Sequence, residues 1–104
     1  MAWILLTIAG GLEVVWASAM KASDGFSRIG PSVLTVVTAA LSFWLLAYAM
    51  RELPLGTAYA VWVGIGALGA FVVGLVMWGE PATPARMASA GLILIGIIGL
   101  KLNG

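Results

Sequence analysis

Long apolar runs separated by isolated charges restrict what this chain can fold into. At a rise of 1.5 Å per residue, a helix of about 20 residues crosses the roughly 30 Å hydrocarbon core of a bilayer. Three runs have that length, and a fourth, Met87–Leu100, reaches it if Thr83 acts as an N-cap and Pro84 as the first helical residue. The sequence therefore predicts an all-α membrane protein with helices at approximately residues 3–20, 32–50, 57–78 and 84–102.

The composition excludes several other classes of protein. Of the 104 residues, 62% are hydrophobic and 9% are charged, whereas a soluble domain carries about a quarter charged residues. The net charge of +1 excludes the basic surface that nucleic-acid binding requires. Because Cys and His are absent, disulfides, zinc sites, thiol nucleophiles and imidazole bases are excluded as well. We therefore expect neither an enzyme nor a metal or cofactor site, and any ionic chemistry must use carboxylates.

Short connections join the predicted helices. Their turn residues are Asp24-Gly25 and Gly30-Pro31 in the first, Leu53–Gly56 in the second and Gly79–Pro81 in the third. Loops of this length leave no room for a soluble domain, so we expect residues 1–104 to form one compact four-helix transmembrane domain. The first run lacks a basic start and carries Glu13, so we expect it to be retained rather than removed as a signal peptide.

Basic residues are divided almost evenly between the two ends of the predicted helices. The first and third loops hold Lys21, Arg28 and Arg86, whereas Arg51 and Lys101 lie on the side of the N-terminal amine. Since Lys and Arg favour the cytoplasmic side, this balance specifies orientation weakly. Two interpretations stay open at this point: one positive residue and early insertion of the first helix decide the orientation, or the chain inserts both ways.

Glu13 is an acid placed deep in the first apolar run, which costs several kcal/mol in a membrane and needs a reason. One reason is a protonated carboxyl that forms an interhelical hydrogen bond, worth about 0.6 to 2 kcal/mol. The other is a site that binds a cation when ionised and a proton otherwise. The sequence favours the second, in which two ligands compete for one group.

A hydroxyl stripe on the second predicted helix offers one partner for this acid. Thr35, Thr38 and Ser42 recur at spacings of three and four residues. Thr and Ser in membrane helices usually bond to carbonyl groups of their own helix, and we expect this of Thr35 and Thr38. Ser42, in the middle of the run, is the one that could reach the Glu13 carboxylate.

Aromatic residues on the first and third predicted helices offer further contacts. Gly10 and Trp16 lie about one turn from Glu13 on the same helix. Tyr59 could donate a hydrogen bond to Glu13, and Trp62 lies too far inside its run for an interfacial anchor. A planar cation such as guanidinium could stack on an indole while bonding to the carboxylate through two parallel hydrogen bonds.

Glycines in the third and fourth predicted helices indicate packing surfaces. Residues 64–69 match the letters G-x-G-x-x-G of a dinucleotide-binding turn, but the strand and helix that this motif requires are missing around them. Paired glycines inside a membrane span instead indicate close helix packing or a kink. Gly91, Gly96 and Gly99 suggest helix packing in general, including packing between subunits.

A transport pathway needs more than one copy of this chain. Transporters generally place a midplane site between two repeats of inverted topology, and the two halves of this sequence show no similarity to each other. The second repeat must therefore come from another copy inserted upside down, which the balanced charges permit. Such an antiparallel homodimer would bring two Glu13 side chains to the midplane, where an entering cation must displace protons.

Several segments together resemble the small multidrug resistance transporters over essentially the whole chain. They are Gly10–Ala17, Lys21–Arg28, Leu53–Trp62, Gly64–Gly66 and Gly96–Lys101. The first and last of these are similar to the guanidinium-exporter subtype. Trp16 distinguishes the guanidinium-exporter subtype from the quaternary-ammonium exporters of the family, which usually carry a small residue at that position.

The resemblance implies an antiparallel homodimer of four-helix chains. It implies that Glu13 binds substrate and protons, that Trp16, Ser42 and Tyr59 orient it by hydrogen bonds, that Trp62 lines the cavity and that Gly10 gives it room. Gly64-Ile65-Gly66 corresponds to the hinge of the family's third helix. A Thr that is typical of the subtype after Trp62 is Val63 here.

These observations together predict a proton-coupled antiporter that exports guanidinium-type cations across the cytoplasmic membrane by alternating access. Its expected partners are the small cation, the lipid bilayer and a second copy of the chain. Broader quaternary-ammonium efflux and a non-transporting membrane subunit are the alternatives.

Overall fold

A computed structural model describes residues 1–103, which form four α-helices and no strand. The helices are Ala2–Ala22 (α1), Ile29–Ala49 (α2), Leu55–Met77 (α3) and Pro84–Asn103 (α4). Each is between 20 and 23 residues long and apolar enough to cross a membrane. The predicted all-α membrane architecture is confirmed.

The second and third helices begin a little earlier than the apolar runs suggested. α2 starts at Ile29 and includes Pro31 in its first turn. A proline is tolerated there because the first N–H groups of a helix have no partner within the helix. α3 starts at Leu55, directly after Pro54 as the N-cap residue.

The start of α4 follows the expected capping pattern. The backbone N–H of Arg86 donates to Thr83 Oγ1 at 3.2 Å, and Pro84 is the first residue of the helix. Thr83 therefore satisfies one of the amide groups that a helix start leaves free, as its side chain and position predict.

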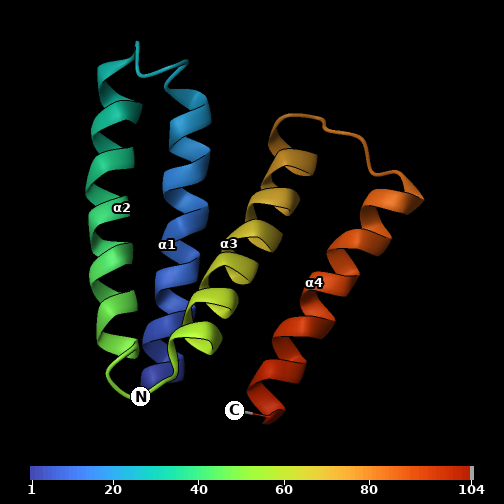
Figure 1. Ribbon diagram of the computed structural model, residues 1–104. Helices are drawn as coiled ribbons and strands as arrows, with labels where there is room; N and C mark the ends of the chain where they lie inside the picture. Colours follow the sequence, from blue (N-terminus) through green and yellow to red (C-terminus); the bar gives the residue numbers. More distant parts are fainter. Residues whose placement is uncertain (104) are drawn as a thin grey trace.

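The helices lie side by side in the order α2, α1, α3, α4 (Figure 1). α1 packs on both α2 and α3, α2 touches α3, and within residues 1–103 α4 packs on α3 alone. The start of α1 and the end of α4 lie at the same end of the molecule, as an even number of spans requires (Figure 1).

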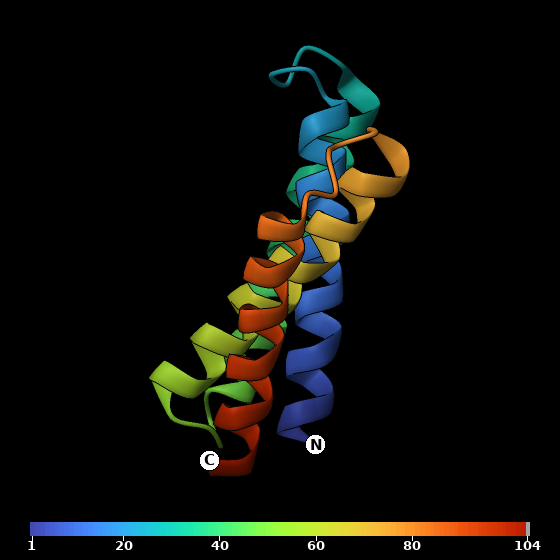
Figure 2. The same ribbon diagram turned by 90° about the vertical axis from the view of Figure 1, so that its right-hand side faces the viewer.

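The molecule is a thin slab and not the compact bundle that its short loops suggested. Its Cα atoms extend over 41 × 34 × 16 Å, so the smallest dimension is less than half of either of the others. The edge view shows the same narrow profile (Figure 2). A slab of this kind leaves both of its faces open to lipid or to another protein.

The buried apolar residues gather where α1, α2 and α3 converge, near the connection between α2 and α3. The residues of this cluster are Leu6, Ala9, Leu46, Ala49, Ala58, Val61 and Trp62; Ala2 and Ala19 are buried outside it. α4 contributes no buried residue within the described chain, although Ile97 and Leu100 lie against this core. α4 is therefore the most weakly attached of the helices.

Candidate functional site

The Glu13 side chain points from α1 onto a bare patch of α3. A Cβ atom added to Gly66 would overlap the Glu13 carboxyl group. The absence of a side chain at Gly66 therefore creates the space that the carboxyl group fills. The sequence indicated close packing at Gly66, but only the structure shows that the group packed there is the acid.

Two buried polar atoms of α1 lack a hydrogen-bond partner among residues 1–103. They are Glu13 Oε2 and Trp16 Nε1, an acceptor and a donor about one helical turn apart. Leaving such a group unsatisfied costs about 1 to 3 kcal/mol, so buried polar groups without partners require an explanation. A ligand from outside the chain that supplies hydrogen-bond donors would satisfy the carboxyl oxygen.

Ser42 joins three helices through its hydroxyl group. It donates to the carbonyl oxygen of Ala9 on α1 at 2.7 Å and accepts from Trp62 Nε1 on α3 at 2.9 Å. All three groups are buried. The single proton of the hydroxyl is donated to Ala9. The sequence suggested that Ser42 could reach the Glu13 carboxylate, but in this conformation the two do not bond.

A row of four aromatic rings crosses the same region. Ring centroids are 6.3 Å apart between Trp16 and Phe43, 5.5 Å between Phe43 and Trp62, and 5.7 Å between Trp62 and Tyr59. These distances are typical of interacting aromatic pairs. Phe43 was missed by the sequence reasoning, although an aromatic residue directly after Ser42 in mid-span was the available signal.

Tyr59 lies at the open end of this row. Tyr59 is 53% exposed on the isolated chain, and its ring lies against that of Trp62 at an angle of 43°. Within residues 1–103, Glu13 Oε2 receives no hydrogen bond from it or from any other group. The phenol is therefore available to a ligand or to a second molecule.

The remaining hydroxyl groups of the stripe behave as predicted. Thr35 Oγ1 donates to the Pro31 carbonyl at 2.8 Å, and Thr38 Oγ1 donates to the Leu34 carbonyl at 2.6 Å. Both bonds stay within α2, so neither hydroxyl is available to Glu13.

The glycines expected to give room and to form a hinge all lie at close helix contacts. A Cβ atom on Gly10 would be 2.6 Å from Ile65 Cγ2, and one on Gly64 would be 2.7 Å from Ile97 Cδ1. Residues 64–66 are helical in the middle of α3. The room at Gly10 is thus filled by Ile65 of α3.

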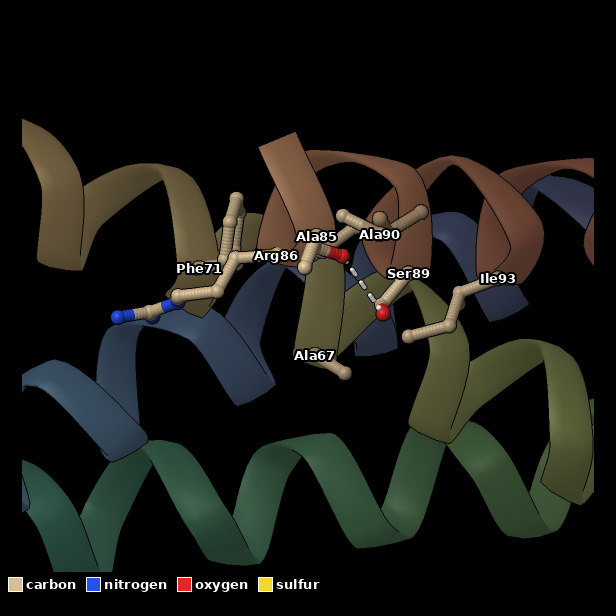
Figure 3. A pocket seen from close by; sticks show the side chains of 8 residues that line it. Ala67, Phe71, Ala85, Arg86, Ser89, Ala90 and Ile93 are labelled. Carbon is tan, nitrogen blue, oxygen red and sulfur yellow. Dashed lines mark hydrogen bonds between the residues drawn. The ribbon is translucent and has the colours of Figure 1, made fainter. Parts of the chain in front are cut away.

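A groove between α3 and α4 does not meet the needs of a cation site (Figure 3). It has a volume of about 330 Å³ and is lined mostly by small or apolar side chains. The Ser89 hydroxyl donates its proton to the Ala85 carbonyl at 2.9 Å. The charged lining residue is Arg86, which reaches along Phe71 in Figure 3 and would repel a cation. Glu13 lies elsewhere.

Comparison with known proteins identifies the family. The model of the family described as Small Multidrug Resistance protein matches residues 1–95. The chain belongs to this family. It is an integral membrane protein with several spans, as the small multidrug resistance family and the four apolar helices of residues 1–103 together indicate.

Proteins similar to this chain carry the name Guanidinium exporter. One from Yersinia pseudotuberculosis serotype I is 63% identical over 102 residues, which cover 98% of each chain. One from Escherichia coli K12 is 60% identical over 103 residues, which cover 99% of this chain and 98% of the relative. One from Salmonella typhimurium is 56% identical over 103 residues, which cover 99% of this chain and 98% of the relative. These relatives are named as transporters and not as enzymes.

Proposed function

We propose that this chain is a proton-coupled antiporter that exports guanidinium-type cations across the cytoplasmic membrane. The observation that carries the proposal is the carboxyl oxygen of Glu13, which is buried and without a partner among residues 1–103. The relatives named Guanidinium exporter support the substrate class.

The chemistry of the site suits a planar cation. Guanidinium presents its N–H donors in a fixed plane and binds a carboxylate through two parallel hydrogen bonds. Aromatic faces attract such a cation, and the row from Trp16 to Tyr59 supplies them. Trp16 Nε1 is a donor on the same helix as Glu13, so we propose that it bonds to the carboxylate after a change of side-chain rotamer.

Coupling follows from competition for one group. An ionised Glu13 carboxylate can pair with the cation, whereas a protonated one cannot, so each ligand must leave before the other binds. Protons that bind from the outer side and leave on the inner side then exchange for cations moving outward. The inward proton gradient of most cells supplies the driving force.

A second copy of the chain is needed to close the site. The slab is 16 Å thick, and its Tyr59 and Phe43 rings remain exposed. We propose an antiparallel homodimer in which two Glu13 side chains share the midplane and an exchange of subunit conformations alternates access. Residues 64–66 of α3 are the proposed hinge of that exchange.

Transport current in proteoliposomes tests the proposal. We expect guanidinium to drive a current with the purified wild-type chain and none with Glu13→Gln, because a neutral amide can neither titrate nor pair with a cation. Glu52→Gln is the matched control, since it removes an exposed carboxylate in the loop between α2 and α3 and should leave the current intact. Coupled transport by Glu13→Gln would refute the assignment.

A tetraalkylammonium ion in the same assay tests the broader alternative. An open apolar groove of about 510 Å³ between α1 and α2 is lined in part by Trp16 and Phe43, so hydrophobic substituents on a cation could contact it. A current from the bulky ion and none from guanidinium would replace the guanidinium proposal by multidrug efflux. No current from either ion would favour a non-transporting subunit.

A further inference from the structure

Two glycines on opposite faces of α3 lie between Glu13 and α4. Gly64 and Gly66 are two residues apart, which on a helix means a rotation of roughly 200° and a rise of about 3 Å. A Cβ atom on Gly64 would lie 2.7 Å from Ile97 Cδ1 and 2.9 Å from Ile97 Cγ1. A Cβ atom on Gly66 would overlap the Glu13 carboxyl group. Ile97 and Glu13 therefore contact the same short piece of backbone from opposite sides.

The contacts between α1 and α3 prevent α3 from moving closer to α1 at this level. Besides the contact of Gly66 with Glu13, Ile65 packs on Gly10 and Val14 packs on Gly69 without room for a further atom. Because packed side chains resist overlap, α3 cannot come closer to α1. On the opposite side of α3 the Ile97 side chain lies against Gly64 and opposes a shift of α3 away from α1 towards α4.

α4 can support α3 where its outer face, which is exposed in one copy, rests on the second copy of the proposed dimer. It contributes no buried residue within the described chain and packs, among residues 1–103, on α3 alone. Its distance from α3 at this level is therefore determined by few side chains. A Cβ atom on Gly64 would meet Ile97 first and then Ile93, at an ordinary contact distance of 3.5 Å.

We propose that Ile97 is a positioning residue that sets the size of the Glu13 site by acting across α3. The inference rests on the proposed binding of cations at Glu13 and adds a specificity determinant that touches neither the acid nor the substrate. Shortening Ile97 lets α3 relax towards α4 and draws Gly66 away from the carboxyl group. A bulkier cation gains more from that space than guanidinium does.

Equilibrium binding to the purified full-length chain tests this inference. The probes are guanidinium and tetramethylguanidinium, and the readout is the ratio of their two Kd values, with thermal stability measured alongside. For Ile97→Ala we expect the ratio of the tetramethylguanidinium Kd to the guanidinium Kd to fall by about threefold or more. Ile97→Val removes only the nearest atom and should shift the ratio in the same direction by less, which covers the case that Ile97→Ala does not fold.

A size exchange between the two helices separates close packing from backbone flexibility at Gly64. Gly64→Ala should weaken guanidinium binding, and the double variant Gly64→Ala/Ile97→Ala should restore it, because the smaller side chain makes room for the added methyl group. Gly11→Ala is the matched control, because a Cβ atom on this glycine of α1 would meet open space. We expect it to leave guanidinium binding unchanged. If Gly64 serves only as a hinge, shortening Ile97 will not restore binding.

The outcomes for the two proposals differ. Suppose that wild type binds guanidinium and Glu13→Gln does not; the proposed function then stands. If Ile97→Ala nevertheless leaves the Kd ratio unchanged and the double variant does not regain binding, the role of Ile97 is refuted. If Glu13→Gln binds as well as wild type, the proposed function fails first.

Discussion

Ser42 connects three helices with one hydroxyl group. A hydroxyl has one proton to donate and lone pairs to accept with, and here the proton goes to Ala9 at 2.7 Å while Trp62 Nε1 donates to the oxygen at 2.9 Å. Both partners are buried, so neither can turn to water if Ser42 is lost. The hydroxyl therefore holds Trp62, and through it the aromatic row, against α1 and α2.

We expect Ser42→Ala to lower the stability of the protein by about 1 to 3 kcal/mol, because it leaves the Trp62 N–H buried without an acceptor. The effects of Ser42→Ala and Trp62→Phe should not be additive, since both remove the same bond; the coupling should be about 1 kcal/mol. Thermal unfolding in detergent measures both.

The matched control for Ser42→Ala is Thr38→Val, another buried hydroxyl on α2. The Thr38 hydroxyl bonds within its own helix, and such bonds contribute little to helix stability, so we expect a much smaller loss. Equal losses at the two positions would show that the bond between helices has no special role.

Among the helices, α4 differs most from the others in how it is held. α1, α2 and α3 each bury several residues, whereas α4 buries none within the described chain. Its stability in one copy therefore depends more on local features, of which the Thr83 cap is the clearest. Its exposed apolar residues include Leu92, Ile95, Ile98 and Leu102.

We expect Thr83→Ala to loosen the first turn of α4. The loss of an N-cap costs about 1 kcal/mol, which corresponds to about fivefold faster hydrogen exchange at the Arg86 amide if that amide exchanges by local opening. Thr83→Ser keeps the oxygen and should exchange at the wild-type rate. An unchanged rate in Thr83→Ala would mean that the bond of 3.2 Å does not stabilise the helix start.

At the scale of the whole molecule, both ends of the helical slab carry pairs of a basic side chain and an aromatic ring. At the end of the first and third loops, Lys21 lies 5.7 Å from the Trp78 ring and Arg86 lies 5.1 Å from the Phe71 ring. The opposite end has two matching pairs, Lys101 with Trp3 at 5.7 Å and Arg51 with Tyr48 at 5.5 Å. Cations and aromatic rings at both interfaces favour neither orientation, which supports the proposed insertion in both.

Shifting the charge balance should separate the two orientations. We expect Arg51→Ala/Lys101→Ala to place the C-terminus mainly outside the cytoplasm, and Lys21→Ala/Arg28→Ala to place it mainly inside. A reporter fused to the C-terminus measures the orientation, and guanidinium resistance of the cells measures export.

If the active form is an antiparallel dimer, each charge variant expressed alone should lose export, and the two expressed together should regain it. Wild type is the control and should show the reporter on both sides. Full export by either variant alone would contradict the antiparallel dimer.

Part of the candidate site could be proposed from the sequence because its signals are local. An acid in an apolar run is costly wherever the helices pack, so Glu13 was evident without a fold. The bonds of Thr35 and Thr38 to their own helix follow from a spacing of four residues. The partners of Ser42 could not be predicted, because they depend on the height at which α1 and α3 cross α2.

The sequence by itself determined that the chain forms four membrane-spanning helices with one deep acid, since helix length, apolar runs and caps are properties of neighbouring residues. Only the tertiary structure decided that Gly66 accommodates the Glu13 carboxyl group, that Gly64 accommodates Ile97, and that the helices of residues 1–103 form a thin slab. The physical reason is that short loops make neighbouring helices antiparallel but leave their rotation and relative height free. Those two quantities depend on side chains from distant parts of the chain fitting together.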